Sequence, residues 1–113
     1  MYLKGKSAAG CELGMPVKCG DKIRLEHIGT GKNLHSHLYK APISGNQEVS
    51  GYGEKGKGDT GDNWTLQCEG NEVFWHRGST INLVHVDTSR FLTSEGKAKF
   101  TTSNCGQGEY IVV

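Results

Sequence analysis

The sequence contains no long apolar run and no segment with helical periodicity. No stretch approaches the ~20 apolar residues that a membrane-spanning helix needs, and no window repeats its apolar residues every ~3.6 positions. Proline occurs twice and glycine 17 times among the 113 residues, so glycine is used at about twice its average frequency. Glycine at this density separates short strands, because it costs a helix roughly 1 kcal/mol relative to alanine. The composition predicts one all-β domain with almost no helix.

The chain also has no excess of charge of either sign. Thirteen lysine and arginine residues stand against twelve aspartate and glutamate residues, which gives a net charge of +1. A nucleic-acid binder would carry a basic stripe, so we predict no nucleic-acid partner, and the short apolar runs predict no membrane insertion. The start, Met1-Tyr2-Leu3-Lys4, contains no signal peptide, and we expect a mature fragment or a cytosolic product.

Catalytic motifs are absent as well. Residues 51–58 nearly spell a phosphate-binding loop, but Gly58 stands where a serine or threonine must hold magnesium. No nucleophile elbow is present, the carboxylates are scattered, and none of the four cysteines forms the CxxC pair of a zinc ribbon. The sequence therefore predicts a protein that is not an enzyme and uses no cofactor.

A β-hairpin pattern occurs twice. Residues 23–28 (IRLEHI) alternate apolar and polar side chains, as a strand with one buried face does. A glycine-containing turn and a second extended segment, residues 33–38, follow. Residues 81–86 (INLVHV) and 91–94 (FLTS) repeat this order at one constant offset. The matched pairs are Ile23 and Ile81, Leu25 and Leu83, His27 and His85, Thr30 and Thr88, Leu34 and Leu92, and Ser36 and Ser94. We interpret the pattern as an internal repeat of hairpins.

Three segments carry a resemblance to a known family, namely IRLEHIGTGKNLHSH, SGNQEVSGYGE and GDNWTL. They resemble the MIR motif, which is named after protein O-mannosyltransferases and the inositol trisphosphate and ryanodine receptors. Within that family they are most similar to the stromal cell-derived factor 2 group of small secretory-pathway proteins. The match covers roughly residues 5–92. It implies a β-trefoil, in which three repeats of four strands close into a barrel with a triangular cap. The residues alone also fit a propeller fragment or an open sandwich.

Only two of the three repeats of a MIR-type trefoil are visible. Residues 17–68 form one repeat, residues 69–113 form a shortened next one, and residues 1–16 resemble the end of a preceding repeat plus a connector. We therefore expect an incomplete trefoil within a single domain, 1–113, in which the second and third repeats are present and the first is missing. Its open edges would leave backbone N–H and C=O groups unpaired. We expect either a further N-terminal repeat or self-association of copies through these edges.

The four cysteines, Cys11, Cys19, Cys68 and Cys105, allow three pairings. The first and fourth strands of a trefoil repeat are antiparallel neighbours. Cys19 precedes one of them and Cys68 ends the other, so these two cysteines could meet. Four buried free thiols are the alternative that the residues leave open. The resemblance to secretory proteins favours at least one disulfide.

The HSH segment supplies the first candidate binding residues. Side chains at i and i+2 of a strand point the same way, so His35 and His37 could form half of a metal site. A third ligand must come from elsewhere, and His27, His76 and His85 are available only if the fold places them nearby. We expect His27 and His85, at matching positions of the repeat, to face the core as structural histidines that donate to backbone carbonyls. Because the LHSH segment belongs to the MIR consensus, the resemblance favours no metal site.

A polar corner at residues 44–48 (SGNQE) supplies the second set of candidates. The amides of Asn46 and Gln47, beside the carboxylate of Glu48, could bracket sugar hydroxyl groups, because each amide offers donors and an acceptor. The competing interpretation is that Asn46 and Gln47 bond their own loop and hold the hairpin corner.

The resemblance implies a non-catalytic protein of the endoplasmic reticulum lumen or the secreted space. Similarity to the stromal cell-derived factor 2 group predicts help in protein folding and quality control within a chaperone complex. The expected partners are a J-domain co-chaperone, the lumenal Hsp70, and unfolded or glycosylated client proteins. The alternatives are a lectin-like or regulatory MIR module that binds a glycan, and an accessory domain of a protein O-mannosyltransferase. Fold analogy does not choose among them.

Overall fold

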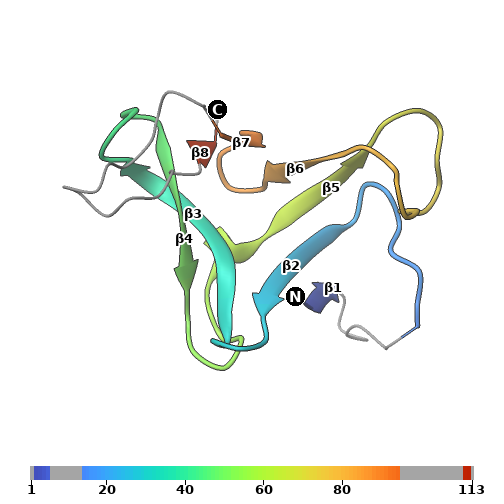
Figure 1. Ribbon diagram of the computed structural model, residues 1–113, viewed down its shortest axis with the longest axis horizontal. Helices are drawn as coiled ribbons and strands as arrows, with labels where there is room; N and C mark the ends of the chain where they lie inside the picture. The colour runs from blue at the N-terminus through green and yellow to red at the C-terminus, as the bar shows by residue number, and fades with distance from the viewer. Residues whose placement is uncertain (1, 6–13, 95–110, 113) are drawn as a thin grey trace.

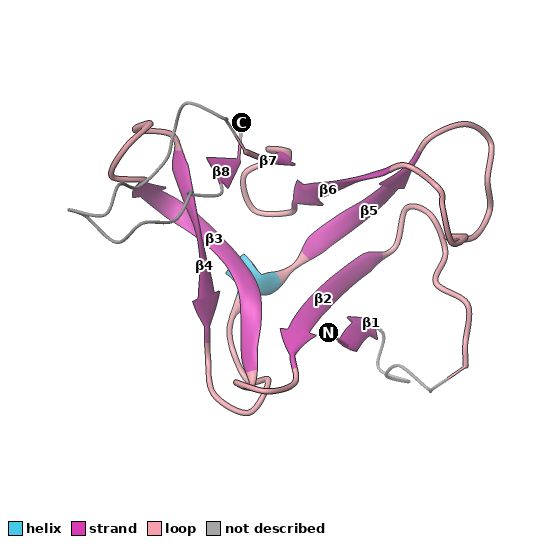
Figure 2. Cartoon of the chain, in the orientation of Figure 1, coloured by secondary structure: helices cyan, strands magenta, loops and turns pink. Residues whose placement is uncertain are grey.

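The protein is built from short β-strands (Figures 1 and 2). The computed structural model describes residues 2–5, 14–94 and 111–112. The strands are β1 (Tyr2–Gly5), β2 (Lys22–His27), β3 (Lys32–Lys40), β4 (Gln47–Tyr52), β5 (Trp64–Cys68), β6 (Ile81–His85), β7 (Leu92–Thr93) and β8 (Ile111–Val112). One turn of 3-10 helix, η1 (Thr60–Asp62), precedes β5. Within the described ranges, no helix is long and apolar enough to cross a membrane. The all-β prediction is confirmed.

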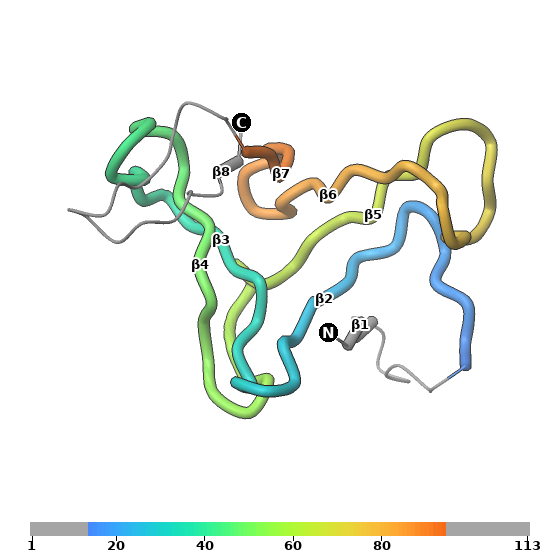
Figure 3. The backbone as a smooth tube through the Cα atoms, viewed as in Figure 1, coloured from blue at the N-terminus to red at the C-terminus, as the bar shows by residue number. Residues whose placement is uncertain are grey.

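The strands pair antiparallel in one sheet around β2. The order is β6-β5-β2-β3-β4-β8-β7, with β1 added beside β2. β2 pairs with β1 over residues 23–26, with β5 near its start and with β3 at its end. Strands β1, β2, β5 and β6 therefore lie side by side in this order. The β3–β4 hairpin leads away from them toward β7 and β8 (Figures 1 and 3). The pairing of β2 with β5 is the first-to-fourth strand contact of a trefoil repeat.

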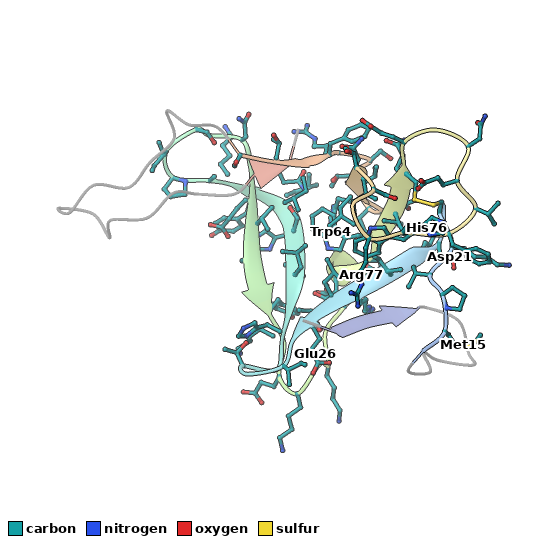
Figure 4. The ribbon with its side chains drawn as sticks, turned by 45° about the vertical axis from the view of Figure 1, so that its right-hand side comes forward. Met15, Asp21, Glu26, Trp64, His76 and Arg77 are labelled. Carbon is teal, nitrogen blue, oxygen red and sulfur yellow. A yellow bond between two sulfur atoms is a disulfide. The ribbon has the colours of Figure 1, made fainter. Side chains whose placement is uncertain are left out.

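The apolar core lies between β2 and β5. Period-2 alternation buries Ile23 and Leu25 of β2, and Trp64 and Leu66 of β5. Trp64 is fully enclosed, and its indole Nε1 donates to the main-chain oxygen of Leu34 at 2.9 Å (Figure 4). The partly buried residues packed against this cluster are Val17, Leu34, Val49, Cys68, Trp75, Ile81, Leu83 and Leu92.

The two repeat-matched histidines lie in different environments, and one prediction is wrong. His85 is fully buried and its Nε2 lies 2.9 Å from the carbonyl oxygen of Gly61, as expected of a structural histidine. His27 is exposed, and its Nδ1 contacts only the hydroxyl of Thr30 at 3.0 Å. The difference arises because η1 packs beside His85, whereas no described element covers His27.

The described strands do not close into a ring. β1 pairs only with β2, and no described strand pairs with residues 81–83 of β6 on the side away from β5. An apolar cavity of about 600 Å³ reaches the core between β2, β3, β4, β6 and β7. The described strands therefore form a partial β-trefoil that is open between β1 and β6. The limits of the individual repeats stay a prediction.

A disulfide joins Cys19, just before β2, to Cys68 at the end of β5. The two Cα atoms are 5.6 Å apart, and Figure 4 draws the bond in yellow. The pair is the one that the trefoil arrangement brings together, because the antiparallel strands β2 and β5 start and end at the same edge. Cys11 and Cys105 lie outside the described residues.

The glycine-rich loop after β4 is packed rather than free. Gly53 has a φ of +92°, and a Cβ there would collide with the carbonyl oxygen of Lys57. The main-chain N–H of Gly56 donates to the carbonyl oxygen of Gly31 at 2.8 Å, which ties the loop to the β2–β3 turn. The loop is therefore fixed against β3 before the chain enters η1.

Candidate functional site

A cavity of about 460 Å³ lies between the β3–β4 hairpin, η1 and the turn after β6. We call it the η1 cavity. Its lining residues are His35, Ser36, His37, Leu38, Tyr52, Asp59, Thr60, Gly61, His85, Asp87 and Thr88. The cavity combines polar groups with aromatic rings and joins two repeats of the chain, so we take it as the candidate site.

Asp62 organises the wall behind the cavity. It is fully buried, and its carboxylate accepts hydrogen bonds from His35 Nδ1 at 2.8 Å and from Asn33 Nδ2 at 3.1 Å. The main-chain N–H of Asp59 adds a third at 3.0 Å, and the Arg24 guanidinium lies 3.9 Å away. Because a carboxylate only accepts, the His35 tautomer that fits this geometry carries its proton on Nδ1 and offers Nε2 as an acceptor.

The sharp turn at η1 depends on glycine and on capping. Asp59 is the N-cap, its carboxylate accepts from the N–H of Gly61 at 2.8 Å, and Asp62 completes a capping box. A Cβ on Gly61 would collide with the His35 ring and lie 2.6 Å from the Ser36 oxygen. Glycine is required at Gly61 because the turn approaches β3 too closely for any side chain.

Gln47 connects the two repeats. It is 5% exposed, and its Nε2 donates to the hydroxyls of Ser36 at 2.9 Å and Thr88 at 3.1 Å. Since His85 donates from Nε2 to Gly61, its Nδ1 accepts from the Thr88 hydroxyl at 2.8 Å. The prediction that Gln47 bonds its own loop is therefore wrong, because its side chain points inward across β3 instead.

The other residues of the polar corner lie outside the cavity lining. Asn46 holds the corner with its backbone, whose carbonyl accepts from Ala41 at 2.6 Å and whose N–H donates to the Ser44 hydroxyl at 3.1 Å. Glu48 places its carboxylate 3.3 Å from Nε2 of His37. Of the five predicted binding residues, His35 and His37 line the cavity together, while Asn46, Gln47 and Glu48 do not.

The histidine pair predicted as half a metal site has a different neighbour set. His35, Asp59 and Asp62 could bring three ligand atoms within 4.8 Å of one another. None of the predicted third ligands, His27, His76 or His85, belongs to this group. A cation there would break the hydrogen bonds that Asp62 already accepts. The group therefore serves as a structural cluster.

Aromatic rings continue the cavity wall along the hairpin. Tyr52 stacks on His35 with ring centroids 4.3 Å apart, and His37 meets His35 edge-on at 5.0 Å. Tyr39 lies beyond His37 at 5.2 Å. His35, His37 and Tyr39 occupy the i, i+2 and i+4 positions of β3, and Tyr52 joins them from β4.

Sequence reasoning missed the residues from η1 and from the turn after β6. Asp59, Thr60, Gly61, Asp87 and Thr88 all line the cavity. The signal for the first group was the segment Asp59-Thr60-Gly61-Asp62, which has the spacing of a capping box before the Trp64 strand. No local signal placed Asp87 beside it, because the Thr60–Asp87 hydrogen bond joins separate repeats.

Comparison with known proteins finds relatives longer than this chain. Stromal cell-derived factor 2 of Homo sapiens is 48% identical over 95 residues, which are 84% of this chain and 44% of that protein. The stromal cell-derived factor 2-like protein of Dictyostelium discoideum is 43% identical over 107 residues, 95% of this chain and 50% of that protein. The chain thus spans about half the length of these curated relatives.

Solved structures agree with the fold and with the family model. The crystal structure of the SDF2-like protein from Arabidopsis thaliana superposes with a TM-score of 0.89 at 41% identity, over 99% of this chain and 61% of that one. A protein O-mannosyltransferase complex of S. cerevisiae, bound to its sugar donor, gives 0.73 at 26% identity, over 88% of this chain and 15% of that one. The model of the MIR domain matches residues 10–111. With the motifs, the open trefoil and these relatives in agreement, the chain belongs to the MIR domain family.

Proposed function

We propose that this chain is a non-catalytic protein-binding domain that assists folding and quality control in the endoplasmic reticulum lumen. The observation that carries the proposal is a group of three large exposed apolar side chains on the β3–β4 hairpin. Leu38 and Tyr39 are 86% and 67% exposed, and Ile43, in the connection to β4, is 37% exposed. Scattered apolar residues are ordinary on a surface, but a group on one element is typical of a contact site. We call these three residues the hairpin patch.

The compartment follows from the disulfide and the relatives. Disulfides persist in oxidising compartments and are rare in the cytosol, and Cys19 and Cys68 are bridged. The similarity to stromal cell-derived factor 2 proteins points to the same secretory-pathway setting. The lumen of the endoplasmic reticulum, or the secreted space after it, fits both observations.

The polar side chains that could take part in catalysis make structural hydrogen bonds instead. The hydroxyl of Ser36 donates to the Glu48 carbonyl at 2.6 Å, and the ring of His85 is held at both nitrogens. The Asp62 carboxylate accepts hydrogen bonds from Asn33, from His35 and from the main-chain N–H of Asp59, and none of these donors is a nucleophile. Ser36, His85 and Asp62 therefore use their polar groups to stabilise the fold, which supports a non-catalytic role.

The partners we propose are a J-domain co-chaperone and the lumenal Hsp70, with unfolded or glycosylated proteins as clients. A rigid trefoil would present the hairpin patch for reversible contact with apolar segments of a client. Such a domain would delay aggregation without chemical turnover.

An aggregation assay tests this proposal. The full chain, with its J-domain partner, should slow aggregation of a denatured model substrate, and the Leu38→Ser/Tyr39→Ser variant should lose most of this effect. Val73→Ser is the matched control, because Val73 is 65% exposed but lies in the β5–β6 connection. Equal protection by the hairpin variant and the control would contradict the proposal.

A second candidate is a lectin-like or regulatory MIR module, or an accessory domain of a protein O-mannosyltransferase. The η1 cavity favours it, because aromatic rings beside carboxylates can also bind sugars, and the mannosyltransferase complex is a structural neighbour. Glycan-array binding without any effect on aggregation would favour this candidate over the first.

A further inference from the structure

The η1 cavity holds acceptor groups that its own residues leave unused. Asp59 is 54% exposed, and only one of its carboxylate oxygens is engaged, by the Gly61 N–H. Asp87 likewise uses one oxygen, which accepts from the Thr60 hydroxyl at 2.8 Å. His35 is 97% buried, with 3% of its side chain exposed, and its Nε2 has no partner among the described residues. Three acceptors therefore remain for a ligand.

The serine and threonine hydroxyls of the cavity wall are already committed, while the hydroxyl of Tyr52 has no partner among the described residues. Thr60 donates to Asp87, Ser36 donates to the Glu48 carbonyl, and Thr88 donates to Nδ1 of His85. The cavity therefore has more free acceptors than free donors. A ligand that donates several hydrogen bonds fits it better than a ligand that must accept them. A sugar hydroxyl needs both kinds of partner, whereas a guanidinium group only donates.

The charged residues around the cavity indicate which charge the ligand carries. No lysine or arginine is among the described residues that line the cavity. Arg24 lies behind it, where its guanidinium donates to Asn63 at 2.8 Å and to the Asp59 carbonyl at 2.9 Å and faces the buried Asp62. The carboxylates of Asp59 and Asp87 lie at the rim without a lysine or arginine among the described lining residues, and Nδ1 of His35 is 3.5 Å from Asp59. Such a site favours a cation.

The rings of the wall suit a planar cation. Tyr52 is 44% exposed and stacks on His35, and His37 stands edge-on beside them. Guanidinium groups stack on aromatic faces while donating to carboxylates in the same plane, which an ammonium group does less well. Leu38 lines the cavity and also belongs to the hairpin patch, so a bound cation would lie next to an apolar contact.

We propose that the η1 cavity binds an arginine side chain of an extended polypeptide, with a neighbouring apolar residue on the hairpin patch. The guanidinium donates to Asp59, to Asp87 and to Nε2 of His35, and it stacks beside Tyr52. This inference rests on the protein-binding function proposed above and names the sequence that a client or partner would offer there.

The test is a titration of the full chain with two short peptides, followed by the amide NMR signals of Asp59, Gly61 and Asp87. The peptides are acetyl-Gly-Leu-Arg-Gly-amide and the same peptide with citrulline, which keeps the shape of arginine and removes its charge. Arginine should bind at least about fivefold more tightly, with an advantage that shrinks as salt is raised. Equal affinities for the two peptides would overturn the proposal. This comparison uses the unchanged chain, so it does not depend on whether a variant folds.

Two variants locate the site. Asp59→Asn and Asp87→Asn keep an oxygen for Gly61 and Thr60, and asparagine is also a good N-cap, so both should fold. Each variant should bind the arginine peptide about threefold more weakly, because a half-exposed ion pair contributes only modestly to the binding free energy. Glu69→Gln, in the connection after β5, makes the same charge change away from the cavity and should change nothing.

Other outcomes separate this inference from its premise. If methyl α-mannoside saturates these signals and the arginine peptide does not, the cavity is a glycan site and the inference fails. If neither binds but the chain still delays aggregation through the hairpin patch, the inference fails and the protein-binding function stands. If Glu69→Gln weakens binding as much as Asp59→Asn does, the attraction is general charge and the assigned cavity is wrong.

Discussion

His27 and His85 end equivalent strands of two repeats and make the same local contact. His27 approaches the Thr30 hydroxyl at 3.0 Å, and His85 approaches the Thr88 hydroxyl at 2.8 Å. The surroundings differ, because only His85 is covered by η1 and reached by the Gln47–Thr88 bond. The comparison teaches that the repeat supplies the local turn, while contacts between repeats decide whether it is a surface feature or part of the core.

The disulfide between Cys19 and Cys68 gives the largest expected effect. It closes a loop with a sequence separation of 49 residues around the repeat that contains β2 and β5, and chain-entropy arguments give such a link about 4 kcal/mol. Cys19→Ser/Cys68→Ser should lower the free energy of unfolding by about that amount in urea denaturation. A loss below about 1 kcal/mol would mean that β2 and β5 hold together without it.

Replacing each histidine by alanine tests directly whether the two positions contribute differently to stability. His85→Ala removes a buried ring and leaves the Gly61 carbonyl without its donor, which should cost about 2–3 kcal/mol. His27→Ala should stay within about 0.5 kcal/mol, because its ring is exposed. Thermal and urea unfolding of the two variants measures this. Similar losses at both positions would show that the local turn, not the cover by η1, supports the fold.

The same contrast applies to two neighbouring amides. Gln47→Ala removes the bridge between Ser36 and Thr88 and should cost about 1–2 kcal/mol. Asn46→Ala should cost less than about 0.5 kcal/mol, because the corner uses its backbone. Urea denaturation of the pair decides between them. An equal loss would mean that Gln47 acts through its own corner after all.

The smallest expected effect concerns the open edges. We expect copies of the chain to associate through β1 and residues 81–83 of β6, since unpaired strand edges attract other strands. Asn82→Lys, on the edge of β6, should weaken this association severalfold in sedimentation velocity without changing the fold, because lysine blunts edges. A chain that stays monomeric at high concentration would contradict the expected self-association.

Strand positions were predictable because they depend on local patterns, whereas the Cys19–Cys68 pairing was suggested only by the resemblance to a trefoil, with free thiols left as the alternative. Alternation in residues 23–28 and 81–86 marked β2 and β6, and the ends of β2 and β5 marked where Cys19 and Cys68 could meet. The candidate site was only half predictable. His35 and His37 share a face by the pleat of one strand, but the direction of Gln47 depends on which hydroxyls lie across β3. No local pattern specifies that.

The sequence by itself determined the hairpin repeats, the burial of Ile23, Leu25, Trp64 and Leu66, the glycine turns and membership of the MIR family, because these depend on local alternation and on recognisable motifs. Only the tertiary structure decided that His85 is core and His27 surface, and that Asp59 and Asp87 share one cavity. The physical reason is that burial and polar pairing are set by elements that meet from different repeats. Asp62 reaches His35 of β3, and Thr60 reaches Asp87 beyond β6.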